Sequence, residues 1–228
     1  MDEIKAVFFD VDDTLYDSTL QVNRARGNAI KAMMEAGLEV SNREGILVLE
    51  EIVREYGSNF PRQFDELLKK LDYNYNPRII AAGVAAYHST KTAYLVPYPD
   101  TVPTLLRLRD LGYRLGIITD GIAVKQWEKL IRMGLQHFFH TVVISSDVGC
   151  DKIDEKIFNI AAKKLKSKPA ESIMVGDRID RDILGAKKAG MHTIRILKGK
   201  YRSQEPQNRR EKPDYVIDNL AEIIEILK

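Results

Sequence analysis

Near its start the chain has the stretch Ile4-Lys5-Ala6-Val7-Phe8-Phe9-Asp10-Val11-Asp12-Asp13-Thr14-Leu15. A short, mostly apolar run that stops at acidic residues is typical of a buried parallel strand. Side chains two positions apart in an extended segment face the same side, so Asp10 and Asp12 should present two carboxylates to one small volume. This stretch therefore predicts a strand whose carboxyl end carries polar chemistry.

The pattern that follows this strand is helical up to about residue 94. Apolar residues recur at helical spacing, and Ser41 stands three residues before Glu44, as in a capping box. Pro77 is placed to open a further helix, because proline is favoured in a first helical turn. Two prolines, Pro97 and Pro99, then end the helical pattern. We expect a helical insertion directly after the first strand.

Beyond residue 100 helical and strand patterns alternate. We expect strands at 113–118, 141–145, 173–175, 192–196 and 215–217, with helices between most of them. Such alternation predicts a parallel sheet with helices on its faces. The sequence thus predicts an α/β fold, in which residues 1–15 and 95–228 form a Rossmann-like core and residues 16–94 form an inserted α-helical cap.

Composition excludes several classes of protein. Of the 228 residues, 44% are hydrophobic and 30% charged, which is enough apolar material for a packed core and excludes the disordered class. The 35 Lys and Arg nearly balance the 33 Asp and Glu, so no global field recruits nucleic acid or anionic lipid. The apolar run Ile79 to Tyr87 is too short to span a bilayer, and the N-terminus lacks a signal-peptide pattern. We expect a cytoplasmic protein with neither nucleic acid nor membrane as partner.

Polar clusters follow four of the expected strands. They are Asp10 to Thr14, Thr119-Asp120-Gly121, Asp147 to Lys152, and Gly176-Asp177. In a parallel sheet of this kind the carboxyl ends of the strands share one edge, where such folds bind ligands. The four clusters should therefore converge.

The residue types in these clusters indicate a metal and an anion. Oxygen ligands without nearby His or Cys specify a hard cation, and Mg²⁺ fits carboxylates that retain water. Asp10 and Asp12 would hold it, and Asp177 could complete the set. Lys152 would add a positive charge that tethers an anionic group, and Thr119 a hydroxyl donor.

Each aspartate also has a simpler interpretation. Asp after a strand is commonly a turn former or a helix N-cap, and we expect that of Asp13, Asp100 and, taken alone, Asp120. Asp180 and Asp182 could likewise cap the helix that follows Gly176. Four matched clusters at separate strand ends are improbable as turn chemistry, and together they favour a functional site.

The clusters resemble the four motifs of the haloacid dehalogenase (HAD) superfamily, in the order of that family. The motif-like segments are Asp10-Val11-Asp12-Asp13-Thr14 after a hydrophobic strand, Ile117-Ile118-Thr119-Asp120-Gly121, Lys152 to Phe158, and Val175-Gly176-Asp177 followed by Asp182. The helical stretch after the first motif is similar to the small cap of one branch of the family. Family members often have proline after the third-motif lysine, where this chain has Ile153, so Lys156 is the alternative for that position.

The resemblance implies phosphoryl transfer by covalent catalysis. Asp10 would attack phosphorus to form an aspartyl-phosphate, while Asp12 would protonate the leaving alcohol and then activate water. The resemblance also implies that Mg²⁺ is held by Asp10, the backbone carbonyl of Asp12 and Asp177, with Asp182 in support. Thr119, Asp120 and Lys152 would bind the phosphoryl oxygens.

The expected function is that of a Mg²⁺-dependent phosphatase acting on a small phosphorylated metabolite, such as a sugar, triose or two-carbon acid phosphate. We expect the cap to act as a lid over the site, with Asn59 and Arg62 touching the non-phosphate end of the substrate. A phosphomutase, a 2-haloacid dehalogenase and a non-catalytic binding protein on the same scaffold are the alternatives. The dehalogenase is disfavoured because it has no leaving alcohol to protonate, and the second aspartate, here Asp12, is typically absent from it.

Overall fold

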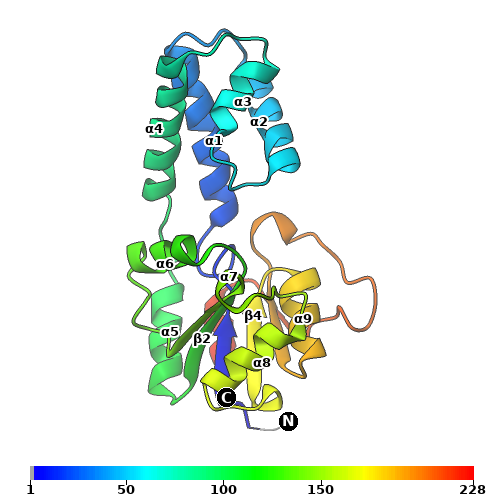
Figure 1. The fold of residues 1–228 in the computed structure, drawn as a ribbon. Coiled ribbons are helices and arrows are strands. Elements are labelled where there is room, and N and C mark those ends of the chain that lie inside the picture. Colours follow the sequence, from blue (N-terminus) through cyan, green and yellow to red (C-terminus); the bar gives the residue numbers. More distant parts are fainter. Residues whose placement is uncertain (1–2) are drawn as a thin grey trace. The chain divides into compact units, whose positions relative to one another are not determined.

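The chain divides into two compact units in the computed structural model, which describes residues 3–228 (Figure 1). One unit, the sheet unit, comprises Met1–Thr19 and Leu95–Lys228. The other, the helical unit, comprises Leu20–Tyr94. Among the described residues, no helix has both the length and the apolar character required to cross a membrane.

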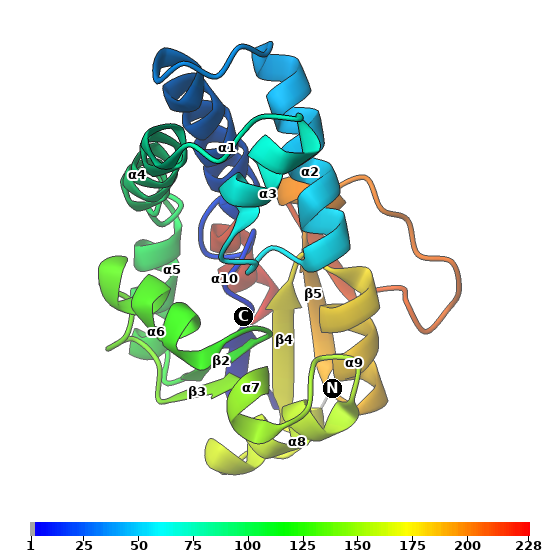
Figure 2. The ribbon, with the colours of Figure 1, turned by 45° about the horizontal axis from the view of Figure 1, so that its top comes forward.

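The sheet unit is built on six parallel strands in the order β3-β2-β1-β4-β5-β6. Figure 2 shows the neighbouring strands β4 and β5 side by side. The strands are β1 (Ala6–Phe9), β2 (Arg114–Thr119), β3 (Thr141–Ile144), β4 (Ser172–Gly176), β5 (His192–Ile196) and β6 (Tyr215–Ile217). The first strand of the sequence is therefore central, and the predicted α/β class with a parallel sheet is confirmed.

Helices connect the strands and cover the sheet. They are α5 (Thr101–Asp110), α6 (Ala123–Arg132), α7 (Ser145–Val148), α8 (Glu155–Lys164), α9 (Leu184–Lys188) and α10 (Ile223–Ile226). Short 3-10 turns lie at η1 (Pro169–Glu171), η3 (Gly199–Tyr201) and η4 (Leu220–Glu222), and a π-helical turn, η2 (Ile179–Ile183), precedes α9.

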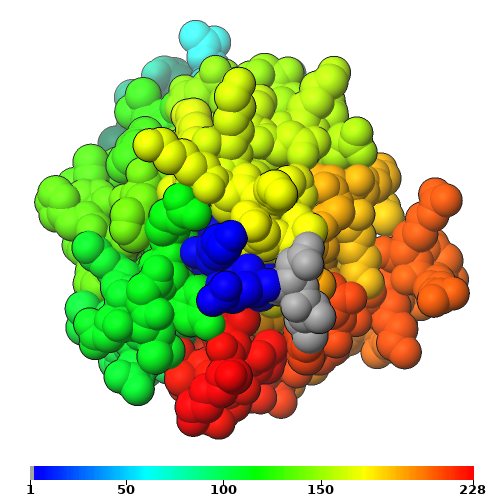
Figure 3. Space-filling view, turned by 90° about the horizontal axis from the view of Figure 1, so that it is seen from below, coloured from blue at the N-terminus to red at the C-terminus, as the bar shows by residue number. Residues whose placement is uncertain are grey.

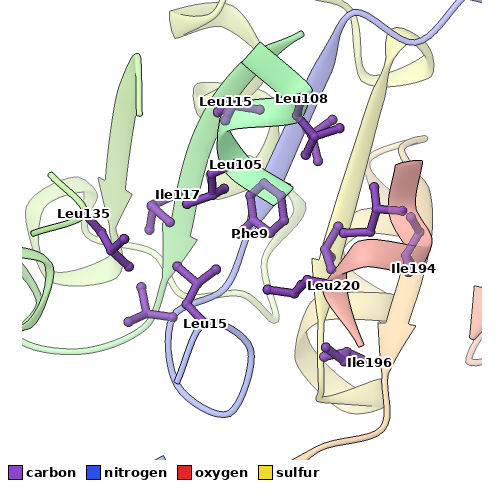
Figure 4. Close-up of a cluster of buried hydrophobic side chains, with 14 of the residues drawn as sticks. Phe9, Leu15, Leu105, Leu108, Leu115, Ile117, Leu135, Ile194, Ile196 and Leu220 are labelled. Carbon is purple, nitrogen blue, oxygen red and sulfur yellow. The ribbon is translucent and has the colours of Figure 1, made fainter. Parts of the chain in front are cut away.

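Two apolar clusters flank the sheet, because alternate side chains of β1 point to opposite faces. Phe9 lies in a cluster with Leu105 and Leu108 of α5 and with Ile194 of β5 (Figure 4). Phe8 lies in the other cluster, which includes buried residues of α8 and α9. Both phenylalanines are fully buried, and each such burial contributes about 1.5–3 kcal/mol.

The helical unit has its own core. Its helices are α1 (Ser18–Glu35), of which the first two residues belong to the sheet unit, α2 (Asn42–Tyr56), α3 (Gln63–Lys70) and α4 (Pro77–Ala93). The expected N-cap forms, because the Ser41 hydroxyl accepts a hydrogen bond from the Glu44 amide at 3.1 Å. A Cβ on Gly83 would lie 2.7 Å from the Met33 sulfur, so α4 approaches α1 closely at this glycine.

The strand register aligns the carboxyl ends of the three central strands. Phe9 of β1 pairs with Ile117 of β2 and with Val175 of β4. The next residues, Asp10 among them, therefore emerge at the same edge of the sheet. Figure 3 views the protein from the opposite side, where the first described residues, in blue, lie beside the C-terminal segment in red.

Candidate active site

A buried lysine joins two buried aspartates at this edge of the sheet. The Lys152 ammonium donates hydrogen bonds to Asp10 Oδ1 and Asp182 Oδ1, both at 2.6 Å. All three residues are at most 5% exposed. Burial opposes the charge of the lysine, but the two carboxylates outweigh that cost and raise the pKa of Lys152. The lysine is thus held charged beside Asp10.

A third carboxylate, that of Asp177, lies in the same group. Oxygens of Asp10, Asp177 and Asp182 lie within 4.8 Å of one another. Burial, reinforced by repulsion from Asp182, raises the pKa of Asp177 to about 9, and burial raises that of Asp10 to about 7. Within residues 3–228 nothing donates a hydrogen bond to the Asp177 carboxylate. When all three carboxyl groups are ionised, their charge exceeds that of the one lysine, and an all-oxygen donor set of this kind fits a divalent cation that would stabilise the ionised form.

Local backbone structure fixes these carboxylates. The Asp10 amide donates to the Val175 carbonyl at 2.9 Å, which ties the end of β1 to β4. Asp182 lies in η2 and accepts a hydrogen bond from the Arg178 amide at 3.0 Å. A Cβ on Gly176 would come within 2.3 Å of the Asp182 carboxylate, so the glycine admits this side chain. Asp182 is therefore a buried member of the site, and its interpretation as a helix cap was wrong.

Asp120 fixes the loop that carries Lys152. Its Oδ1 accepts a hydrogen bond from the Lys152 amide at 3.0 Å, and its Oδ2 accepts one from Arg181 Nη1 at 3.0 Å. The same Arg181 nitrogen reaches Asp151 at 3.1 Å. Ile122, not Asp120, occupies the N-cap position of α6. The carboxylate of Asp120 thus connects two of the motif-like segments, and its interpretation as a turn former missed this role.

The remaining phosphate-binding candidates lie in the sheet unit. Thr119 ends β2 and is 1% exposed, next to Asp120. Of the two lysines considered for the third motif, Lys152 is the buried one. Lys156 is largely exposed and forms a 3.6 Å ion pair with Asp154. The structure therefore favours Lys152 over the alternative.

Asp12 belongs to a different polar group. Its two carboxylate oxygens accept hydrogen bonds from Lys129 Nζ at 2.6 and 2.7 Å, and Oδ1 also accepts one from the Tyr16 hydroxyl at 2.6 Å. Burial acts to raise the pKa of Asp12, but Lys129 and these hydrogen bonds outweigh burial and lower it. No motif or strand end in the sequence marks Lys129 or Tyr16 as partners of Asp12.

Two other aspartates that were expected to be turn formers have further partners. Asp13 does lie in a turn, with φ of 56°, and its carboxylate accepts hydrogen bonds from the amide and hydroxyl of Thr19 at 2.8 and 2.6 Å. Asp100 occupies the N-cap position of α5, as expected, but its side chain makes no capping hydrogen bond and instead accepts one from the Leu220 amide at 2.6 Å. These carboxylates hold loops of the sheet unit together.

The candidate substrate contacts Asn59 and Arg62 lie in the helical unit. Both are exposed residues of the segment between α2 and α3. Arg62 occupies the N-cap position of α3, and its side chain makes no capping hydrogen bond. Both side chains lie on the surface of the helical unit.

Known proteins resemble the chain over its whole length. Residues 4–190 match the family described as "Hydrolase: haloacid dehalogenase-like hydrolase". A glyceraldehyde 3-phosphate phosphatase from Methanopyrus kandleri is 54% identical over 227 residues, covering 99% of this chain and 97% of that protein. One from Pyrococcus furiosus is 48% identical over 228 residues, covering 100% and 95%.

A solved structure extends the similarity to the fold. The HAD hydrolase YfnB of Bacillus subtilis, whose crystal structure has magnesium bound, superposes with a TM-score of 0.70 at 22% identity, covering 99% of each chain. The predicted family and the predicted reaction class, hydrolysis of a phosphoric monoester, are confirmed. The chain belongs to the haloacid dehalogenase-like hydrolases.

Proposed function

We propose that the chain is a Mg²⁺-dependent phosphatase that hydrolyses glyceraldehyde 3-phosphate through an aspartyl-phosphate on Asp10. The observation that carries the proposal is the buried group in which Lys152 contacts Asp10 and Asp182 beside the Asp177 carboxylate. The substrate is taken from relatives that are 54% and 48% identical over nearly the full chain. A triose phosphate is also one of the three substrate classes that the sequence predicts.

The charges of the site favour a bound cation. Asp10, the backbone carbonyl of Asp12 and Asp177 would hold Mg²⁺, and Asp182 would support them. When bound, the ion offsets the repulsion between the carboxylates and a phosphate dianion and polarises a phosphoryl oxygen. Magnesium in the YfnB structure supports this choice of ion. A hard divalent cation is also what three buried carboxylates fit best.

The chain's own side chains carry the two chemical steps. In the first, a carboxylate oxygen of Asp10 attacks phosphorus and the bond from phosphorus to the ester oxygen breaks. That oxygen takes its proton from Asp12, which has to bind a proton from solvent before this step because Lys129 keeps the pKa of Asp12 low in this structure. In the second, water attacks the phosphorus of the aspartyl-phosphate and gives its proton to Asp12. Inorganic phosphate leaves and the Asp10 carboxylate is restored.

The phosphoryl oxygens need positive and donor groups throughout these steps. Lys152, already placed 2.6 Å from the attacking carboxylate, supplies the charge. Thr119 supplies a hydroxyl, and Asp120 contributes by fixing the Lys152 backbone. Because Lys152 contacts Asp10 in this structure, we propose that one of its hydrogen bonds passes to the phosphate when substrate binds.

The helical unit is proposed to supply the specificity. Asn59 and Arg62 would contact the triose end of the substrate, and the unit would exclude water as a lid. We propose that the chain binds a small charged metabolite, and that it binds neither nucleic acid nor membranes. A phosphate ester of this charge does not cross a bilayer unaided, which is why we propose the cytoplasm as the compartment.

The test is the release of inorganic phosphate from a panel of phosphate esters. We expect kcat/KM for glyceraldehyde 3-phosphate to exceed that for phosphoglycolate and glucose 6-phosphate by about tenfold or more. Excess chelator should abolish turnover. Appearance of an isomeric phosphate ester in place of inorganic phosphate would identify a phosphomutase, and no turnover of any ester with Mg²⁺ present would favour a non-catalytic protein.

A further inference from the structure

The Asp12 carboxylate is held by three side chains from two segments of the sheet unit. Lys129 of α6 contacts both of its oxygens, at 2.6 and 2.7 Å, and the Tyr16 hydroxyl contacts Oδ1 at 2.6 Å. Gln126, one turn before Lys129, lies 3.5 Å from Oδ2. The Asp12 carboxylate is not among the clustered oxygens of Asp10, Asp177 and Asp182. Its position is therefore set by partners of its own.

These partners are themselves fixed. Tyr16 is 1% exposed, packs in the apolar cluster of Phe9 and forms isolated backbone bridges with Asp12 and Pro97. Gln126 donates a hydrogen bond to the Asp120 carbonyl at 2.7 Å, which ties α6 to the end of β2. The Lys129 ammonium lies 5.9 Å from the centre of the Tyr16 ring. The three donors thus form a rigid frame around one carboxylate.

An ordinary surface ion pair does not explain why three side chains hold the Asp12 carboxylate. Pairs at the surface contribute about 0–1 kcal/mol, because water competes and two flexible side chains must be ordered. The Lys129 and Asp12 side chains are 20% and 36% exposed, so exposure does not distinguish this pair, but Lys129 binds both carboxylate oxygens and Tyr16 adds a further hydrogen bond, which fixes the orientation of the carboxylate. Proton transfer to a leaving oxygen depends on how the donor is oriented, and small misplacements are costly.

We propose that Lys129, assisted by Tyr16, is a positioning residue that sets the orientation of the Asp12 carboxylate for proton transfer to the leaving oxygen. The inference rests on the proposed function, in which Asp12 is the acid of the first step. Lys129 acts through Asp12 and not on the phosphate. Its loss should therefore matter most for esters whose leaving group needs a proton.

Phenyl phosphate and p-nitrophenyl phosphate provide the test. The two esters are similar in shape, but p-nitrophenol is much the more acidic phenol and leaves without help. The quantity to measure is kcat/KM, because it covers the steps up to departure of the phenol. Asp12→Asn serves as the reference, and should lower kcat/KM for phenyl phosphate far more than for p-nitrophenyl phosphate.

Lys129→Met keeps the aliphatic stem and removes the ammonium. We expect it to lower kcat/KM for phenyl phosphate about tenfold and for p-nitrophenyl phosphate about twofold or less, a part of the 10²–10⁴ that acid–base catalysis supplies. Tyr16→Phe should give the same selective loss in smaller degree, and Lys129→Arg should restore part of it. If Lys129→Met fails to fold, Tyr16→Phe, which removes a single hydroxyl, decides the question.

A matched control exists in the pair Lys187–Asp214, at 3.0 Å. Its side chains are 24% and 35% exposed, close to the 20% and 36% of Lys129 and Asp12. Lys187→Met should leave kcat/KM unchanged for both phenyl phosphate and p-nitrophenyl phosphate. A selective loss that appears with Lys129→Met and not with Lys187→Met supports the inference.

Four outcomes would overturn the inference. If Lys129→Met lowers kcat/KM equally for phenyl phosphate and p-nitrophenyl phosphate, Lys129 is a structural residue. A loss confined to glyceraldehyde 3-phosphate, with the ratio of the phenyl esters unchanged, would make it a substrate contact. If Asp12→Asn itself shows no dependence on the leaving group, the acid assigned in the proposed function is wrong and the inference falls with it. A selective effect in Asp12→Asn without one in Lys129→Met and Tyr16→Phe refutes the inference alone.

Discussion

Asp10 is the residue on which the proposed chemistry depends most directly. In Asp10→Asn the amide oxygen still accepts the Lys152 hydrogen bond, which measures 2.6 Å in the parent chain, but an amide is not a nucleophile. We expect phosphate release to fall by at least about a hundredfold. The melting temperature should stay unchanged or rise, because the substitution removes a buried negative charge beside Asp177 and Asp182.

Phosphate release and thermal melting of the purified variant check this prediction. Mass spectrometry must exclude deamidation of the asparagine back to aspartate. Activity above about a hundredth of the parent value, with deamidation excluded, would remove Asp10 from the role of nucleophile.

Arg62 tests the proposed specificity at a single exposed residue. A hydrogen bond to a charged group contributes about 1.5–3 kcal/mol, so Arg62→Ala should lower kcat/KM for glyceraldehyde 3-phosphate about tenfold or more. Turnover of p-nitrophenyl phosphate, which has no triose, should hardly change. Because Arg62 is exposed and makes no capping hydrogen bond, its loss should leave the melting temperature in place. Equal losses on both substrates would refute the assignment.

The sequence predicts the residues of the site to different degrees. Asp10, Lys152 and Asp177 could be found because each follows a strand or stands in a motif, and the parallel sheet brings such positions together. Lys129 carries no such signal, since a lysine on an amphipathic helix usually faces water. Its contact with Asp12 depends on the exact placement of α6 over Tyr16, which a linear pattern does not contain.

At the scale of elements, the contact between α9 and the Lys152 loop depends on a glycine. A Cβ on Gly185 would lie 2.1 Å from the Lys152 carbonyl oxygen and 2.5 Å from the Phe158 ring. Gly185→Ala must push the loop away, and overpacking of this kind costs about 1–3 kcal/mol. We expect lower stability and, because Lys152 moves with its loop, lower kcat.

Gly27 of α1 is the matched control, because it is also a helical glycine and a Cβ there would meet nothing within 4 Å. Gly27→Ala should stabilise the chain by about 0.5–1 kcal/mol, since alanine loses less backbone entropy in a helix. Urea unfolding and phosphate release measure both effects. An unchanged kcat in Gly185→Ala would show that α9 does not position the lysine.

Asp214 connects β5 to the segment that enters β6, and its effect on stability should depend on pH. Its carboxylate accepts hydrogen bonds from the amide and hydroxyl of Thr193, both at 2.8 Å. Burial acts to raise the pKa of Asp214, but these bonds and Lys187 outweigh burial and lower it below the usual 3.8. A lowered pKa in the folded state means that the stabilisation is present above pH 3.8 and is lost as the pH falls further.

The prediction is a difference between the parent and Asp214→Asn. At pH 7 the variant should be less stable by about 1 kcal/mol, within the range for a hydrogen bond to a charged group after allowance for exposure. That difference should shrink as the pH is lowered through and below 3.8. Urea unfolding at a series of pH values measures it, and a difference that grows on acidification would contradict the assignment.

Some helices and strands can be predicted from local sequence patterns alone, and others cannot. The strand expected at 192–196 is β5, and the N-cap at Ser41 opens α2 as expected, because apolar runs and caps are local signals. The sequence predicts an ordinary helix after Gly176, capped by Asp180 or Asp182, but the chain forms a π-helical turn from Ile179 to Ile183. Asp182 turns back against Gly176 there, a tertiary contact that no local propensity describes.

For the molecule as a whole, a divalent cation should couple its site to global stability. Asp10 directly follows β1 and Asp177 directly follows β4, so an ion held by both, with Asp182 in support, joins parts of the chain that are far apart in the sequence. A ligand that binds only the folded state stabilises it, by about 2.7 kcal/mol at a concentration one hundred times its Kd. We therefore expect Mg²⁺ to raise the melting temperature, whereas KCl at equal ionic strength should not.

Ca²⁺ should separate binding from catalysis. Ca²⁺ takes oxygen ligands as Mg²⁺ does, so it should bind the site and raise the melting temperature. Because it prefers more ligands at longer distances, it should not support turnover, and it should inhibit the Mg²⁺-loaded enzyme. Asp177→Asn, which neutralises a carboxylate of this group that accepts no hydrogen bond from the described residues 3–228, should abolish the thermal response to both ions. Full activity in excess chelator, equal turnover with Ca²⁺, or an undiminished thermal response in Asp177→Asn would each refute a divalent-cation site at these carboxylates.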